Sequence, residues 1–73
     1  MFNAILMPVS SSNLAAVGYN PAAALLTIAF HGDRVYQYFR VPAGVYSELM
    51  RAESHGKYFH AAIRDCYPYR RVQ

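Results

Sequence analysis

Hydrophobic and polar residues alternate most clearly in residues 25–42, where two alternating runs flank a short polar segment. A period of two places successive side chains on opposite faces and is typical of a half-buried β-strand. Residues 31–34, between the runs, include Gly32, which tolerates the positive φ that a tight turn requires. The stretch therefore predicts a β-hairpin.

The polar residues of the hairpin indicate its register. If Thr27 and Gln37 are both exposed to solvent, the opposite face of the hairpin forms the core. This register requires a three-residue connection with Gly32 at a positive φ. The residues expected on the core face are Leu26, Ile28, Phe30, Tyr36 and Tyr38.

A third strand is expected before the hairpin, in residues 14–19, where Gly18 marks a bulge or a position beneath a covering segment. Asn20 and Pro21 are typical of a turn that leads into the hairpin. Residues 5–9 could also be extended, but Pro8 lacks a ladder donor, which restricts this segment to a sheet edge or an irregular arm. The pattern predicts a three-stranded antiparallel meander.

The second half of the chain shows helical periodicity. Apolar residues recur at three- and four-residue spacing from Val45 to Ala52, and Pro42 suits the start of this helix. Ser54 is a candidate N-cap for a second helix that extends to Cys66 and carries Cys66 on its apolar arc. Two helices packed on one face of the sheet give an α+β fold in the order βββαα.

The length of 73 residues indicates a single domain spanning residues 1–73, with residues 1–10 as an extended arm and residues 68–73 as a basic tail. Hydrophobic residues make up 55% of the chain, which argues against disorder. A single cysteine excludes an internal disulfide and suits a reducing cytoplasm. No apolar run approaches the roughly 20 residues of a membrane-spanning helix. We expect a soluble, cytoplasmic monomer.

No residues form a recognisable catalytic pattern, because the chain lacks a carboxylate pair and a glycine-rich phosphate loop. His55 and His60 are five residues apart and miss a shared helix face, so a metal site is not expected. Tyr36 and Tyr38 could stack on nucleic-acid bases, although aromatic residues on the inner face of a strand ordinarily pack in the core. We expect a binding protein that is not an enzyme and uses no cofactor, metal or small-molecule substrate.

The charge distribution indicates where a partner would bind. The net charge is +3, and five of the seven lysines and arginines follow residue 50. The expected partner-binding residues combine the basic face of the second helix with the tail: Lys57, His60, Arg64, Tyr69, Arg70 and Arg71. Such a surface can hold phosphates or an acidic protein. The alternative is a charged helix face that serves only solubility.

Several motifs, spread over nearly the whole chain, resemble those of the KTSC domain. They are SSNL at 11–14, VGYNP at 17–21, LTIAF at 26–30, YQY at 36–38, VP at 41–42, and AESHGKYF at 52–59 followed by IR at 63–64. This small bacterial and phage family occurs alone and at the C-terminus of some lysyl-tRNA synthetases, and RNA binding has been suggested for it. The resemblance implies no catalytic residues, and it implies an RNA-binding module as one candidate function.

The free-standing length and the arginine-rich end also resemble small phage-encoded transcription regulators that bind host bacterial RNA polymerase. This resemblance implies contact with polymerase core subunits in the host cytoplasm, inhibition of initiation and, as a further activity, antitermination. We therefore expect a polymerase-binding regulator, with RNA as the alternative partner.

Overall fold

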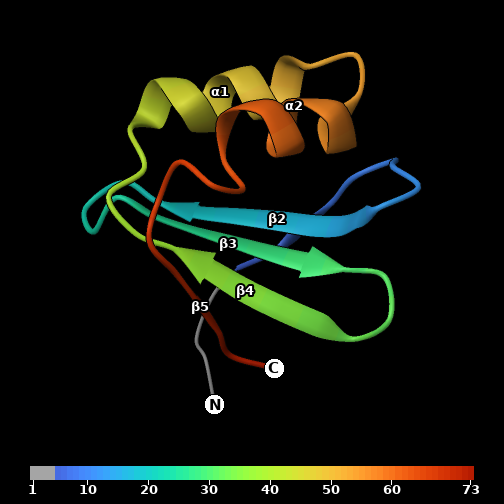
Figure 1. Cartoon of the computed structure of the whole chain (residues 1–73), viewed down its shortest axis with the longest axis horizontal. Helices are drawn as coiled ribbons and strands as arrows, with labels where there is room; N and C mark the ends of the chain where they lie inside the picture. Colours follow the sequence, from blue (N-terminus) through green and yellow to red (C-terminus); the bar gives the residue numbers. More distant parts are fainter. Residues whose placement is uncertain (1–4) are drawn as a thin grey trace.

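The computed structural model describes residues 5–73, in which two helices cover one face of an antiparallel sheet (Figure 1). The elements are β1 (Met7–Pro8), β2 (Leu14–Asn20), β3 (Leu25–Phe30), β4 (Arg34–Tyr38), α1 (Ala43–Arg51), α2 (His55–Ala62) and β5 (Tyr69–Arg71). The strands lie in the sheet in sequence order, and both helices lie in the connection between β4 and β5.

The expected α+β class is confirmed, but the prediction of three strands is wrong, because β1 and β5 extend the sheet to five. Residues 68–73, expected as a basic tail, include β5 and pair with β4 instead. Val35 N donates to the Gln73 carbonyl over 2.9 Å, and Val72 N donates to the Val35 carbonyl over 2.8 Å, so the end of the chain is bonded along β4. Residues 1–4 of the expected arm lie outside the described residues, and Pro8 occupies an edge strand, as its missing donor requires.

The hairpin register is confirmed. Leu26 lies opposite Tyr38 and Phe30 lies opposite Arg34, which leaves a three-residue turn. In this turn Gly32 has a φ of 97° and Asp33 a φ of 64°. The left-handed backbone of both residues reverses the chain within the expected length.

The predicted exposure of Thr27 and Gln37 is wrong. They face away from the helices, as expected, but their exposed fractions are 2% and 8%, and Gln37 Nε2 donates to Thr27 Oγ1 over 3.4 Å. The segment at Ile5 lies against this face, because a β-carbon on Gly18 would overlap the Ile5 carbonyl. Of the two alternatives predicted for Gly18, the position beneath a covering segment is therefore correct. The bulge of β2 lies elsewhere, between Leu14 and Ala16.

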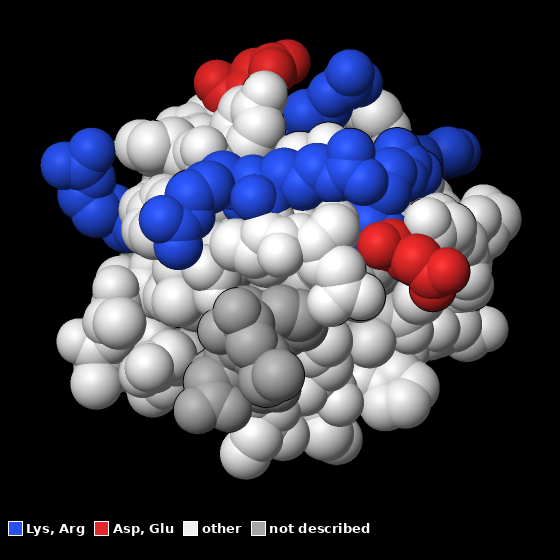
Figure 2. Space-filling view, turned by 90° about the horizontal axis from the view of Figure 1, so that it is seen from below, with Lys and Arg blue, Asp and Glu red and all other residues white. Residues whose placement is uncertain are grey.

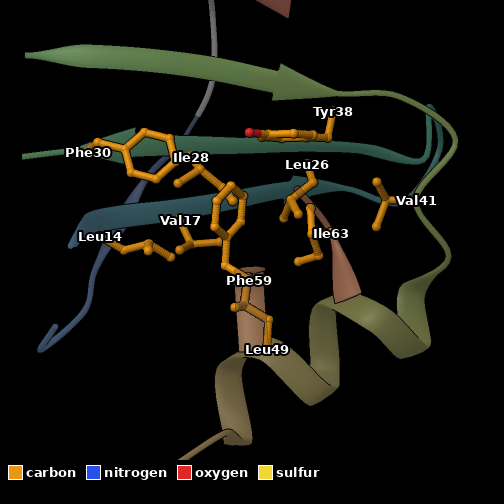
Figure 3. Packing of buried hydrophobic residues seen from close by; sticks show 10 residues of the cluster. All are labelled: Leu14, Val17, Leu26, Ile28, Phe30, Tyr38, Val41, Leu49, Phe59 and Ile63. Atoms are coloured by element: carbon orange, nitrogen blue, oxygen red, sulfur yellow. The ribbon is translucent and has the colours of Figure 1, made fainter. Parts of the chain in front are cut away.

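The hydrophobic core fills the layer between the sheet and the helices. Phe59 projects from α2 toward the sheet, between the side chains of Phe30 and Tyr38 (Figure 3). The buried residues of the core are Leu14, Val17, Leu26, Ile28, Phe30, Tyr38, Val41, Leu49, Phe59 and Ile63. Tyr38 is 4% exposed, so core packing is confirmed for this half of the central tyrosine pair.

The helix starts follow the expected signals, but the end of α2 does not. Pro42 precedes α1, and Ser54 Oγ accepts a hydrogen bond from Lys57 N over 3.2 Å at the start of α2. The helix ends at Ala62 rather than Cys66, because Ile63 leaves helical geometry with a φ of −122° and inserts fully into the core. Cys66 is consequently exposed and does not belong to a buried arc. No helix within residues 5–73 is long and apolar enough to cross a membrane.

Candidate functional site

The residues predicted to bind a partner are all exposed, and α2 together with the turn after it brings three of them together. Lys57 and His60 lie on the outer side of the helix, opposite the buried Phe59, and Arg64 lies two residues beyond its end. His60 Nδ1 and Arg64 Nη1 are 3.2 Å apart, so these two side chains form one polar unit on the last turns. The predicted exposed helix face is confirmed for Lys57 and His60, whereas Arg64, which the periodicity also places on the helix, lies beyond its end.

The pairing of β5 divides the remaining predicted residues between the two faces of the sheet. Residues opposite each other in neighbouring strands point to the same face. Tyr69 and Arg71 pair with Tyr38 and Tyr36 and therefore lie on the helix side. Arg70 pairs with Gln37 and lies on the far side. The structure thus brings Tyr69 and Arg71 to the side of Lys57, His60 and Arg64, and it separates Arg70 from them.

A hollow of about 350 Å³ lies between α2 and the β4–β5 edge of the sheet. Its floor consists of side chains that are buried or half-buried, and its mouth consists of exposed ones. The floor residues are Phe30, Tyr36, Tyr38, Phe59 and Asn13, and the mouth residues are Arg34, His60, Arg64, Asp65 and Tyr69. We call this site the aromatic hollow.

The rings of the aromatic hollow hold one another in place. Phe59 meets Phe30 at 5.3 Å and Tyr38 at 5.6 Å between ring centroids, with interplanar angles of 68° and 77°. Edge-to-face contacts of this kind are favourable and directional. Tyr69 lies 5.6 Å from Tyr38 and 5.8 Å from Tyr36 and is itself 58% exposed. Tyr69 is therefore the ring of this cluster that is most accessible to a partner.

The Tyr38 hydroxyl stays neutral across the physiological range. Burial, reinforced by the neighbouring Tyr36 and Tyr69, raises the pKa of Tyr38 to about 12. Desolvation acts in this direction because it disfavours the charged phenolate. The hydroxyl therefore supplies the aromatic hollow with a hydrogen-bond donor and not with a negative charge or a general base.

Basic side chains predominate around the mouth of the aromatic hollow. Arg34 packs its guanidinium 5.7 Å from the Phe30 ring centroid, and Arg64 lies across the hollow on the segment that follows α2, with Asp65 as the single acidic lining residue. Sequence reasoning missed Arg34 because it weighted basic residues by their position after residue 50. The hairpin register could have found it, since that register places Arg34 on the same face as Tyr36. Figure 2 shows a band of basic side chains across the face seen from below.

A second, wider hollow of about 710 Å³ lies beside the first turns of α2. It shares Asn13 and His60 with the aromatic hollow, so the two adjoin. Lys57 and Ser54 line its far part. We call the two hollows together the α2 groove.

The histidines do not converge on a metal site. His55 Nδ1 lies 2.8 Å from the Leu49 carbonyl, and His31 Nε2 lies 2.9 Å from the Ser11 carbonyl, so both rings bond to the backbone. Among residues 5–73, no three His, Cys, Asp or Glu side chains lie close enough together to hold a metal ion. The chemistry available at the α2 groove is binding through positive charge, hydrogen bonds and aromatic packing.

Comparisons with known proteins agree with this architecture. The family model of the KTSC domain matches residues 10–67. The crystal structure of a KTSC domain protein from Yersinia pestis superposes with a TM-score of 0.93 at 32% identity, covering 97% of this chain and 100% of that one. A protein of Tsukamurella paurometabola is 37% identical over 59 residues, which are 81% of this chain and 88% of the relative.

A longer relative carries a similar segment within an enzyme. The lysine–tRNA ligase of Nostoc sp. is 36% identical over 67 residues, or 92% of this chain. These residues make up only 12% of the ligase, so this chain corresponds to a small part of that protein.

Proposed function

This chain belongs to the KTSC domain family, and we propose that it is a non-enzymatic protein that binds bacterial RNA polymerase core subunits and regulates transcription. The observation that supports this proposal best is the basic rim of the aromatic hollow. Arg34 and Arg64 line the mouth, and Arg71 lies on the same side of the sheet. A rigid basic surface of this kind is complementary to an acidic protein surface and accelerates association with it.

The state of the aromatic rings favours a protein partner over a nucleic acid. Single-strand binders stack bases on aromatic faces that are open to solvent. Tyr38 and Phe59 are 4% and 3% exposed and cover each other edge to face, so they offer no open stacking platform. The choice of RNA polymerase among acidic proteins rests on the resemblance to small phage regulators. Contact with its core subunits would then inhibit initiation, with antitermination as a further effect.

The proposal is tested by affinity capture from a bacterial lysate treated with nuclease. The variant Arg64→Glu/Arg71→Glu changes two exposed residues on the helix side of the sheet. We expect the parent protein to retain polymerase subunits and the variant to bind the purified polymerase about tenfold or more weakly, which corresponds to about 1.4 kcal/mol.

The control is Arg51→Glu, a charge reversal on α1, where the exposed Arg51 pairs with the exposed Glu48 and lines neither hollow. Its affinity should match that of the parent because Arg51 lies outside the proposed surface, and its fold should persist because exposed pairs of this kind contribute little to stability. The proposal fails if the parent retains no polymerase subunit, or if the double variant binds as tightly as the control.

A second candidate function is RNA binding, favoured by the similar segment in the lysine–tRNA ligase of Nostoc sp.. The exposed Tyr69 and the neighbouring Arg71 could hold one base and its phosphate. In this case nuclease treatment should remove all retained partners. Arg64→Glu/Arg71→Glu should also flatten the dependence of log K on log salt by about one unit or more, because fewer counterions are released.

A further inference from the structure

We propose that the aromatic hollow is an anchor site for an acidic protein segment, in which one aromatic side chain of the partner enters the hollow and flanking carboxylates bind Arg34 and Arg64. This inference rests on the proposed function and specifies the chemistry that the partner must carry at this site.

The size and lining of the hollow suit one inserted side chain. Its volume of about 350 Å³ falls at the lower end of the range of ligand-binding pockets, about 300–1,000 Å³. The floor belongs to the hydrophobic core, since Phe30, Tyr38 and Phe59 are less than one-tenth exposed. An inserted group would therefore meet an existing, rigid surface, and the protein would not have to rearrange its core to accept it.

The arrangement of the rings favours an aromatic anchor. Neighbouring rings in the cluster already meet at centroid distances from 5.3 Å for Phe30–Phe59 to 5.8 Å for Tyr36–Tyr69. Another phenyl or indole ring can continue this packing against the two accessible rings, the half-buried Tyr36 and the exposed Tyr69. Tyr69 lies at the mouth with much of its ring exposed, so it can cover the inserted ring from the outside. Anchors of this kind, enclosed by less critical contacts, typically dominate the binding energy of an interface.

The charges at the mouth require that the partner be acidic next to its anchor. Arg34 and Arg64 line the mouth together with His60, and Asp65 is the only carboxylate among the lining residues. A guanidinium binds a carboxylate through two parallel hydrogen bonds, which fixes orientation as well as adding affinity. A basic segment would instead meet like charge. The aromatic floor and the two arginines together therefore favour a partner segment in which an aromatic residue is flanked by acidic residues.

The shape of the site favours an extended segment over a small molecule. The aromatic hollow continues past Asn13 and His60 into the second hollow, where Lys57 supplies a further exposed positive charge. A partner backbone along the α2 groove could place a second acidic residue near Lys57, whereas a free nucleotide or amino acid would occupy one hollow only. A nucleobase would also lack open ring faces on which to stack, except at Tyr69.

The test is a titration of the full ¹⁵N-labelled chain with three blocked peptides, followed by amide shifts. The first peptide is Gly-Asp-Glu-Phe-Glu-Asp-Gly, the second replaces Phe by Ala, and the third replaces the acidic residues by their amides. We expect the first to shift amides of Phe30, Tyr36 and Tyr69 and to bind about tenfold or more tightly than either control. The inference is overturned if the first peptide does not bind at millimolar concentration, if the Ala peptide binds equally well, or if uridine 5′-monophosphate or oligouridylate binds the hollow more tightly.

Variants of the protein separate the anchor site from general charge attraction. Arg64→Gln and Tyr69→Ala should each weaken the first peptide about fivefold or more, whereas Arg51→Gln, on α1 and outside the lining, should leave its affinity unchanged. Equal losses for Arg51→Gln and Arg64→Gln would overturn the inference. If the peptides behave as expected but polymerase is not captured, the proposed function fails and the anchor site stands. If polymerase is captured and the peptides fail, the proposed function stands without this anchor.

Discussion

The two alanine substitutions Gly18→Ala and Gly44→Ala should have opposite effects on stability, although the chemical change is the same. At Gly18 the added methyl group would overlap the Ile5 carbonyl and come within 3.0 Å of Leu6 Cδ2. A backbone carbonyl cannot rotate aside as a flexible side chain can, so the covering segment has to move. At Gly44, on the first turn of α1, no heavy atom outside the adjacent residues and the local helix backbone lies within 4 Å of the added methyl group.

The magnitudes follow from two opposing terms. Replacing glycine by alanine in a compatible backbone stabilises a protein by about 0.4–1 kcal/mol, because the unfolded chain loses freedom. Overpacking costs about 1–3 kcal/mol. Gly44→Ala should therefore raise the free energy of unfolding by about 0.4–1 kcal/mol, and Gly18→Ala should lower it by about 1–2 kcal/mol. In a domain of this size each kcal/mol shifts Tm by about 4–8 °C.

Thermal melts followed by circular dichroism measure both changes, and amide hydrogen exchange locates the first. The Val9 N–H donates to the Ala15 carbonyl over 3.1 Å beside the β1–β2 pairing, so it should exchange faster in Gly18→Ala. A Tm for Gly18→Ala at or above that of the parent would refute the position of the Ile5 segment. A loss of stability in Gly44→Ala would refute the open environment at the start of α1.

Three further outcomes follow from the same structure. Tyr38→Ala should lower the free energy of unfolding by about 3–5 kcal/mol in a denaturant melt, because it removes a ring packed on Phe59, and a loss below about 1 kcal/mol would contradict this. The pKa of Tyr38 is raised to about 12 from an ordinary value of 10.0, so the neutral Tyr38 hydroxyl should contribute fully to stability below pH 10. This contribution to the free energy of unfolding should be lost between pH 10 and 12. Tyr38→Phe should remove the corresponding loss of stability from alkaline melts. Arg71→Glu should weaken partner binding more than Arg70→Glu, because only Arg71 lies on the helix side; equal losses in a binding titration would contradict the β5 register.

Local signals explain why the hairpin and the helix starts could be predicted. The alternation in residues 25–42 and the left-handed Gly32 act over a few residues, and Ser54 caps α2 through its own third neighbour. The fifth strand lacks such a signal. It contains three exposed residues, too few to show alternation, and it is stabilised by pairing with β4, more than thirty positions earlier in the chain. Its two arginines suit an exposed edge strand but equally suit a solvated tail.

The candidate site was predictable to the extent that it follows one helix. The exposure of Lys57 and His60 follows from helical periodicity, and the structure agrees; Arg64 is also exposed, but in the turn after the helix. That Arg34 and Arg64 line the same hollow depends on how α2 docks on the sheet, which no short-range pattern contains. The prediction that Cys66 lies on the apolar arc of α2 is wrong for a related reason. The fully buried Ile63 turns the chain back toward β4 before the helical pattern ends.

The aromatic hollow and the core share residues, and this limits which substitutions can report on binding. Phe30, Tyr38 and Phe59 form the floor of the hollow and also belong to the central cluster. A small domain has little stability to spare, so truncating one of these rings would lower the folded population together with the affinity. A ligand that binds only the folded state should correspondingly raise Tm. Substitutions at the exposed mouth, at Arg64 and Tyr69, can therefore separate binding from folding, whereas substitutions of the floor cannot.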